Sequence, residues 1–293
     1  MQFLIYILVY PFLWIVSILP FRFLYVLSDF VYLVIYYVIG YRKKVVTDNL
    51  KLAFPEKSEN EIFSIRKKFY HHLCDMMLEA IKSITISEKE MKKRYVFTNV
   101  NEIHKLEQEQ RSIVLFMGHY ASWEWVFILQ TKVKHTGYAV YKRLSNRYFD
   151  RLVKRIRAKY NSYLITTKET YTTLIEAKKN NELTLNGFVF DQSPMLNKAL
   201  YWQDFMDVNV PVHVGGEILA KRLGMATTFL KVRKIKRGYY EATFYDIIRD
   251  VSKYKDFDIT KMALKRVEEQ IYEAPEYYFW THKRWKHRNK RPK

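Results

Sequence analysis

The chain has 293 residues, enough for one large domain with a full hydrophobic core. Lysine and arginine number 50 against 30 aspartate and glutamate, and the net charge of +20 favours an anionic partner such as a nucleic acid, an anionic membrane leaflet or an acidic carrier protein. The single cysteine, Cys74, excludes an intrachain disulfide, and its helical apolar surroundings indicate packing rather than nucleophilic chemistry.

The N-terminal residues predict a membrane anchor over residues 1–41. No charged side chain occurs from Phe3 to Phe21, a stretch close to the roughly 20 residues that span a bilayer core. No lysine or arginine precedes this stretch and no small-residue cleavage site follows it, so a retained anchor is favoured over a cleaved signal peptide. A second apolar stretch, Phe23 to Ile39, is compatible with a second membrane helix or with one that lies in the interface.

The residues after the anchor predict its orientation. Arg42, Lys43 and Lys44 follow at once, and an excess of cations on the cytoplasmic flank of a membrane segment places the body of the protein on the cytoplasmic side. The alternative is an N-terminal hairpin buried in a soluble protein, which Pro11 and Pro20 would allow.

The remaining chain, 42–293, predicts one α/β domain with a mixed sheet flanked by helices. Apolar residues at helical spacing predict a long helix over 62–80, with Ser58 available as its cap. Runs rich in strand-forming residues follow at 112–117, 138–141, 183–190, 226–232 and 240–245, and helical patterns separate them at 122–133, 146–160, 169–180, 214–223 and 259–272. The last dozen residues form a basic tail.

A histidine five residues ahead of an acid occurs twice, and its surroundings distinguish the two pairs. His104 and Glu109 lie in a charged run that indicates an exposed helix. His119 directly follows the apolar strand 112–117, and a helix carrying Trp123 and Trp125 follows it. Ligand sites gather at such strand–loop–helix corners of an α/β sheet, so His119 with Glu124 is the candidate catalytic pair.

The spacing of this pair also predicts its geometry. Five residues along a continuous α-helix leave two side chains about 140° apart, so the pair cannot meet on a straight helix. With His119 in the loop and Glu124 in the first helical turn, capped by Ser122, the carboxylate can hydrogen-bond one imidazole nitrogen. The histidine is then held as a general base for a hydroxyl that the substrate supplies, without an acyl-enzyme intermediate.

Several sequence blocks carry a family resemblance over nearly the whole chain. They are Gly40 to Val46 with Asn49-Leu50 and Ala53 to Glu56, Glu79, Gly118-His119 to Glu124-Trp125, Tyr141 to Asn146, Asp191-Gln192-Ser193, and Pro275 to Lys286. In this order and spacing the sequence resembles the late acyltransferases of lipid A biosynthesis, of the lauroyl/myristoyl transferase type. These are relatives of the glycerolipid acyltransferases that share the His-x4-Asp/Glu motif. Asn161 stands where the family usually has a glycine, and Val212 to Gly215 replaces a small-residue stretch.

The resemblance implies a glycerolipid acyltransferase-like fold and a set of substrate-binding residues. Lys142, Arg143 and Asn146 belong to the block that lies near the acyl and phosphate groups, although the two cations are also compatible with solvated strand ends. Lys142, Arg143 or backbone amides near Gly118 are candidate donors to the oxyanion. Asp191 and Gln192 end an apolar strand and are expected either to bind sugar hydroxyls or to hold the site together.

The same resemblance implies the partners and the location. The donor is an acyl thioester of acyl carrier protein or coenzyme A, the acceptor is a phosphorylated glycolipid, and the enzyme belongs at the cytoplasmic face of the bacterial inner membrane. No cofactor and no metal are expected, because the histidines and acids lack ligand spacing. The alternative acceptors are a lysophospholipid or an aminolipid. A membrane-tethered nucleic-acid-binding protein is the more distant alternative, but no nucleic-acid-binding motif accompanies the charge.

Overall fold

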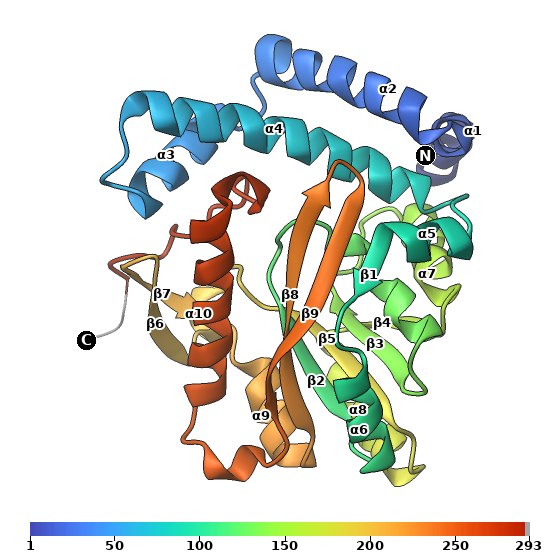
Figure 1. Ribbon diagram of the computed structural model, residues 1–293, viewed down its shortest axis with the longest axis vertical. Helices are drawn as coiled ribbons and strands as arrows, with labels where there is room; N and C mark the ends of the chain where they lie inside the picture. Colours follow the sequence, from blue (N-terminus) through green and yellow to red (C-terminus); the bar gives the residue numbers. More distant parts are fainter. Residues whose placement is uncertain (291–293) are drawn as a thin grey trace.

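A seven-stranded sheet forms the centre of the protein in the computed structural model, which describes residues 1–290 (Figure 1). Its strands are β1 (Tyr95–Phe97), β2 (Ile113–Met117), β3 (Thr136–Tyr141), β4 (Ser162–Thr166), β5 (Thr184–Val189), β8 (Ala226–Lys236) and β9 (Tyr239–Ile248). The spatial order is β1-β9-β8-β2-β5-β3-β4, and every neighbouring pair is parallel except β8 with β9. The predicted mixed sheet is confirmed.

Helices cover both faces of this sheet. On one face, α9 (Gly215–Leu223) and α10 (Asp258–Glu273) pack against β2 and β8, with α8 (Thr170–Lys179) beside α9. On the other, α5 (Glu88–Arg94) and the 3-10 helix η2 (Glu124–Thr131) pack against β1, and η2 also against β3. Further elements belong to the body around the sheet. They are α6 (Asn101–Gln108), α7 (Arg147–Ala158), the hairpin β6 (Tyr201–Phe205) with β7 (Val208–Val212), and the 3-10 turns η3 (Leu196–Lys198), η4 (Val251–Lys253) and η5 (Pro275–Tyr277).

The long helix α4 (Glu59–Lys82) crosses one end of the sheet and connects the N-terminal helices to the body (Figure 1). Ser58 caps it as predicted, because its side chain accepts from the Glu61 amide while the Glu61 carboxylate accepts from the Ser58 amide. The helix α3 (Lys43–Ala53) packs on α4, and Asn49 in α3 donates to the carbonyl oxygens of Trp280 and His282 near the C-terminus.

The apolar N-terminus forms two helices that lie against the body. These are α1 (Gln2–Ile18) and α2 (Phe21–Leu33), and α2 continues into a π-helical turn, η1 (Val34–Ile39). Phe21–Ile39 is the one helical stretch among residues 1–290 long and apolar enough to cross a membrane, and 22% of it is buried against the protein. The apolar N-terminal surface consists of Phe3, Leu4, Ile5, Ile7, Leu8, Val9, Phe12, Trp14, Ile15, Ile18, Phe23, Val26, Phe30, Leu33, Tyr37, Val38 and Ile39, all exposed.

Both ends of α1 contact the rest of the protein. At its start, Gln2 donates to the carbonyl oxygen of Ser145, and the Gln2 carbonyl accepts from Asn146. At its end, Lys82 of α4 donates to the carbonyl oxygens of Ser17 and Leu19, each at 2.7 Å. The helix therefore lies along the body instead of leaving it.

Some predicted elements differ from the structure. The helix expected at 122–133 is the 3-10 helix η2, and Ser122 does not cap it. The strands β1, β4, β6 and β7 were not predicted, three of them being only five residues long and β1 only three. Of the expected basic tail, residues 291–293 lie outside the described part of the chain. Arg284 and Trp285 are buried, so that part of the C-terminal segment belongs to the core and is not a solvated tail.

Candidate active site

His119 stands at the carboxyl end of the fully buried strand β2, next to the end of β5. Because these strands are parallel neighbours, their carboxyl ends bring His119 and Asp191 together. The imidazole Nδ1 lies 2.6 Å from Asp191 Oδ1, and the His119 backbone amide donates to Asp191 Oδ2 at 3.1 Å. One buried carboxylate thus fixes both the ring and the backbone of His119.

The charge on Asp191 is stabilised by the same contacts. Its side chain has no solvent exposure. Burial by itself raises the pKa of Asp191, but the charge of His119 and the hydrogen bonds from the His119 ring and amide outweigh it, so the pKa lies below its usual range. An ionised Asp191 accepts the proton on Nδ1, and this leaves Nε2 as the nitrogen able to take a proton from a substrate.

The predicted contact between His119 and Glu124 is absent from the hydrogen bonds of residues 1–290. Glu124 Oε2 instead accepts from Arg157 of α7 at 2.6 Å. Two features explain the difference: Asp191 already occupies Nδ1, and Glu124 begins a 3-10 helix instead of the first turn of a capped α-helix. In this structure the carboxylate that contacts His119 is therefore Asp191 and not the one five residues away.

Aromatic side chains from two segments enclose the imidazole. The ring centroid of Trp123 lies 5.2 Å from that of His119 in an edge-on arrangement, and that of Phe279 lies at 6.1 Å, nearly parallel to it. The Phe279 amide donates to the His119 carbonyl at 3.1 Å, and the Ala121 amide donates to the Tyr277 carbonyl at 2.9 Å. The C-terminal block singled out in the sequence is therefore a wall of this site.

A groove of about 480 Å³ opens at His119. Of the predicted residues, Glu124, Lys142 and Gln192 line it together with His119. Arg143 does not line it, since its side chain is 62% exposed and lies 3.7 Å from Glu169. Asn146 does not line it either, because its Oδ1 accepts from the first amides of α7 and its Nδ2 donates to Gln2. The substrate-binding prediction for Arg143 and Asn146 thus has no support from their positions.

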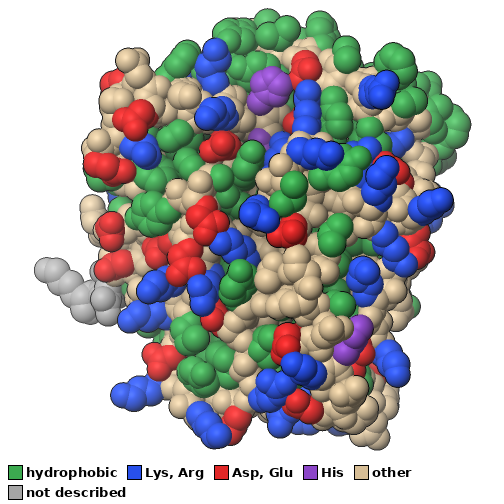
Figure 2. Space-filling view, viewed as in Figure 1, with side chains coloured by type: hydrophobic (Ala, Val, Ile, Leu, Met, Phe, Trp, Pro, Cys, Tyr) green, Lys and Arg blue, Asp and Glu red, His purple; other side chains and the backbone are tan. Residues whose placement is uncertain are grey.

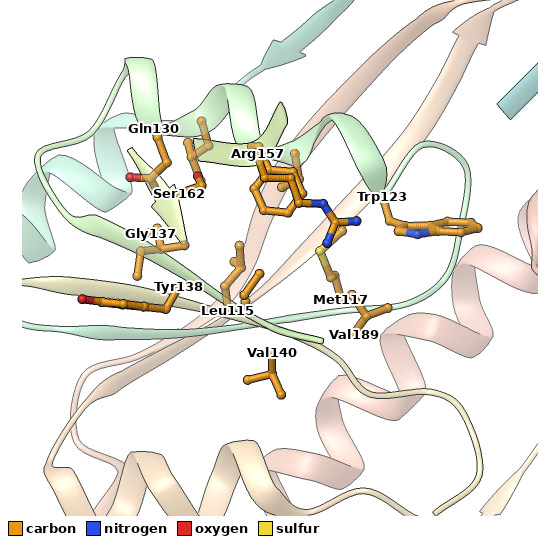
Figure 3. Close-up of a pocket in the computed structure, with 16 residues that line it drawn as sticks. Leu115, Met117, Trp123, Gln130, Gly137, Tyr138, Val140, Arg157, Ser162 and Val189 are labelled. Atoms are coloured by element: carbon orange, nitrogen blue, oxygen red, sulfur yellow. The ribbon is translucent and has the colours of Figure 1, made fainter. Parts of the chain in front are cut away.

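A small apolar cavity of about 70 Å³ adjoins the groove (Figure 3). Trp123, Val140, Arg157 and Val189 line both spaces. In Figure 3, Arg157 lies with Met117 and Trp123 toward one end of the cavity, whereas Gln130 and Gly137 lie toward the other. Its lining is mostly apolar, which suits a hydrocarbon group, and His119 is not part of that lining.

Sequence reasoning missed two cationic residues of this region. Arg157 holds Glu124 where the cavity meets the groove. Arg284 is fully buried, donates to the Pro211 carbonyl at 3.0 Å, and lies over the ring of Phe205. Burial lowers the pKa of Arg284, opposed by Tyr278 and Asp191. The sequence could have indicated Arg157, because it belongs to a helical pattern with one apolar face. It could not have indicated that Arg284 is buried, because the residues around Arg284 are mostly basic.

Glu79, the acid that matched the resemblance, lies outside the groove. Its two carboxylate oxygens accept from the hydroxyls of Tyr25 in α2 and Tyr240 in β9, at 2.9 and 2.8 Å. Burial raises its pKa to about 7, against the lowering effect of Lys234 and of the tyrosine hydrogen bonds. Glu79 therefore connects α2, α4 and the sheet.

The family that the chain matches and the individual relatives that it resembles are the same kind of enzyme. Residues 1–287 match the family described as "Bacterial lipid A biosynthesis acyltransferase". The chain is 25% identical over 250 residues to the lipid A biosynthesis lauroyltransferase of Escherichia coli (strain K12), covering 84% of this chain and 80% of that protein. It is 22% identical over 252 residues to the lipid A biosynthesis palmitoleoyltransferase of the same organism, covering 84% and 79%.

Proposed function

The chain belongs to the bacterial lipid A biosynthesis acyltransferases, and on that premise we propose that it moves a fatty acyl chain from an acyl thioester to a hydroxyl group of a lipid A precursor. Its relatives are named as lipid A acyltransferases, and the chain is accordingly an O-acyltransferase. The observation that carries the proposal is the His119–Asp191 pair at the junction of an open groove with an apolar cavity.

The proposed reaction is a direct transfer with His119 as general base. Nε2 takes the proton of the acceptor hydroxyl while its oxygen attacks the thioester carbonyl carbon, and Asp191 stabilises the imidazolium that forms. The tetrahedral intermediate then collapses, the carbon–sulfur bond breaks, and the imidazolium returns the proton to the leaving thiolate. The products are the ester and the free thiol, and no group on the enzyme is acylated.

The apolar cavity is the proposed site of the acyl chain. Its lining runs from Trp123 and Val189 next to the groove to Gly137 and Ser162. Arg157, fixed by Glu124, lies where the thioester would pass between cavity and groove. Together with Lys142 it is a candidate donor to the oxyanion, because a cation at that point stabilises the charge that develops on the carbonyl oxygen.

The apolar N-terminal surface is the proposed site of membrane attachment. Because α1 contacts the body at both ends and its outward side chains are apolar, we propose that this surface rests in the interfacial region of one leaflet. The proposed leaflet is the cytoplasmic one of the inner membrane, and the cations at 42–44 support this orientation. Acyl carrier protein is the proposed donor, since its acidity suits the +20 charge.

The function is tested with purified full-length protein and a panel of acyl donors and acceptors. The donors are acyl carrier protein and coenzyme A thioesters, and the acceptors are a lipid A precursor, a lysophospholipid and an aminolipid. We expect transfer to the lipid A precursor to dominate. Preferred transfer to one of the other lipids, with unchanged lipid A acylation in a deletion strain by mass spectrometry, would overturn the acceptor assignment.

A pair of histidine variants tests the base. His119→Ala is expected to abolish transfer while the protein still accumulates in membranes. His104→Ala is the matched control, because His104 lies on the amphipathic surface helix α6 and, within residues 1–290, the one hydrogen bond of its ring is to the Lys132 carbonyl, at 2.8 Å. Turnover near the normal rate in the first variant would remove His119 from the mechanism.

A further inference from the structure

A second, basic cleft lies outside the groove that contains His119. It has a volume of about 700 Å³ and lies between α4, the η1 end of α2 and the tip of the β8–β9 hairpin. None of the residues lining it also lines the groove at His119. Its lining includes five cationic side chains, Lys67, Lys68, Lys234, Lys236 and Arg237, against two carboxylates, Asp75 and Glu276.

The two cations deepest in the cleft are already neutralised. Arg237 donates to both carboxylate oxygens of Asp75 at 3.0 Å and also to Asp29. The Lys234 side chain is 9% exposed, lies 3.5 Å from Asp75, and contacts the Nδ1 of His72 at 3.2 Å. These ion pairs hold the bottom of the cleft in place, because side chains from several elements contact the single carboxylate of Asp75.

Three lysines on the cleft wall remain uncompensated. Lys67 and Lys68 project from α4 and Lys236 from β8, and none has a carboxylate oxygen within 4 Å among residues 1–290. Holding three ammonium groups around one hollow is electrostatically unfavourable without an anion. Ammonium groups are also common donors to phosphate oxygens, which accept several charge-assisted hydrogen bonds at once.

The cleft borders the apolar N-terminal surface. Tyr37, which is 55% exposed and belongs to that surface, also lines the cleft. Figure 2 shows hydrophobic side chains gathered along the edge formed by α1 and α2, with lysine, arginine and histidine side chains grouped directly beside them. A lipid whose chains lie against this surface would therefore bring its headgroup to the mouth of the cleft.

The cleft is also connected to the loop that carries His119. Tyr277 forms part of the cleft wall, and its ring lies edge-on to His72 with centroids 4.9 Å apart. Its carbonyl accepts from the Ala121 amide, two residues after His119. The η5 segment thus lines the cleft and is hydrogen-bonded to the loop that carries His119.

We propose that this basic cleft binds the phosphate of a membrane lipid headgroup, separately from the groove at His119. The phosphate can belong to the acceptor itself, in which case the inference rests on the proposed function, or to an anionic phospholipid of the leaflet. A lipid is favoured over the acidic donor protein because the cleft is concave and opens beside the surface proposed to rest on the membrane.

Vesicle binding by the full-length protein tests the site without any assay of catalysis. The probes are phosphatidylcholine vesicles that contain either phosphatidic acid or no anionic lipid. The variant Lys67→Gln/Lys68→Gln/Lys236→Gln removes the three lysines that have no carboxylate partner among residues 1–290. The matched control, Lys179→Gln/Lys255→Gln/Lys261→Gln, removes three exposed lysines at the opposite end of the molecule, near α8 and the start of α10 (Figure 1).

We expect the cleft variant to lose affinity for phosphatidic acid vesicles by about 100-fold, roughly fivefold per lysine, while binding to neutral vesicles is unchanged. The control should lose no more than about threefold. Equal losses in the two triple variants would overturn the proposal, since only net charge would then matter. Thermal unfolding of both variants checks that each remains folded.

Kinetics in neutral detergent distinguish the two lipid sources. If the cleft holds the acceptor's phosphate, the cleft variant raises KM for the phosphorylated acceptor but not for its dephosphorylated form. If it holds a leaflet phospholipid, both KM values stay unchanged while vesicle binding falls. A raised KM for the acyl carrier protein donor with intact vesicle binding would overturn the proposal in favour of a protein-docking role. Absence of transfer by the unaltered protein, with the vesicle difference intact, would refute the proposed function alone.

Discussion

The substitution Asp191→Asn tests the identity of the carboxylate that serves His119. In the native site, one Asp191 oxygen accepts from the ring and the other from the backbone amide of the same residue. An asparagine offers one acceptor and one donor, so it can satisfy only one of these contacts. Because the position has no solvent exposure, water cannot supply the missing partner.

The expected loss follows from that geometry. If the new amide group faces Nδ1, it donates to that nitrogen and leaves the proton on Nε2, which can then no longer act as a base. The corresponding exchange in a serine protease triad lowers kcat about 10⁴-fold through the wrong tautomer. If the oxygen faces Nδ1, the loss of a charged hydrogen bond worth about 1.5–3 kcal/mol still slows the reaction by roughly 10- to 100-fold. We expect a fall in kcat of about 10³-fold with little change in either KM.

The assay follows thiol release from the donor together with incorporation of labelled acyl chain into the acceptor. Circular dichroism at increasing temperature controls for folding, since the exchange is nearly isosteric. A well-folded Asp191→Asn protein that retains more than a tenth of the native kcat would refute the pairing of Asp191 with His119.

Three further predictions concern other parts of the site. Glu124→Gln and Arg157→Met should each lower kcat/KM by roughly 10- to 100-fold, and the double variant should be no worse than either, because they remove one shared contact; additive losses would show that the two act separately. Gly187→Leu should shift preference toward shorter acyl chains by roughly tenfold or more. A Cβ at this position would meet only the Tyr138 carbonyl oxygen, at 3.8 Å, and would enter the cavity; an unchanged chain-length profile would place the acyl chain elsewhere. The pKa of Glu79 rises from 4.5 to about 7 on folding, so the folded state binds the extra proton and its stability falls as pH rises through that range, by up to roughly 3 kcal/mol. In chemical denaturation between pH 5 and 8, the buried histidines add an opposite trend, so the test is the difference between two slopes: stability should fall more, or rise less, with pH in the native protein than in Glu79→Gln. Equal slopes would remove Glu79 as a contributor.

The position of His119 could be predicted from the sequence because local signals agree there. A continuous apolar run is typical of a strand buried on both faces, and β2 is such a strand. The residue that directly follows it must then lie at the carboxyl edge of the sheet. The same reasoning located the end of β5, since Asp191 and Gln192 close another apolar run.

The partnership between these two positions could not be predicted, because it depends on the order of the strands. Two strands, β3 and β4, intervene along the chain, yet β5 inserts between β2 and β3 in space. Sequence distance favoured Glu124, five residues away, over Asp191, 72 residues away. The 3-10 form of η2 was equally hidden, because its apolar pattern also fits an α-helix.

One departure from the family pattern has a direct structural explanation. Asn161 adopts a φ of +56°, in the left-handed region, immediately before β4. Glycine enters this region freely, and asparagine is among the few other residues that tolerate it. The replacement therefore keeps the turn, and it carries no information about the acceptor or the acyl chain.

The wall formed by residues 277–285 has a consequence for biosynthesis. The ribosome makes the hydrophobic helices first, whereas Phe279 and Tyr277 emerge after every strand of the sheet and only then bond to the His119 loop. The nascent polypeptide can thus meet the lipid surface well before its reactive centre is complete.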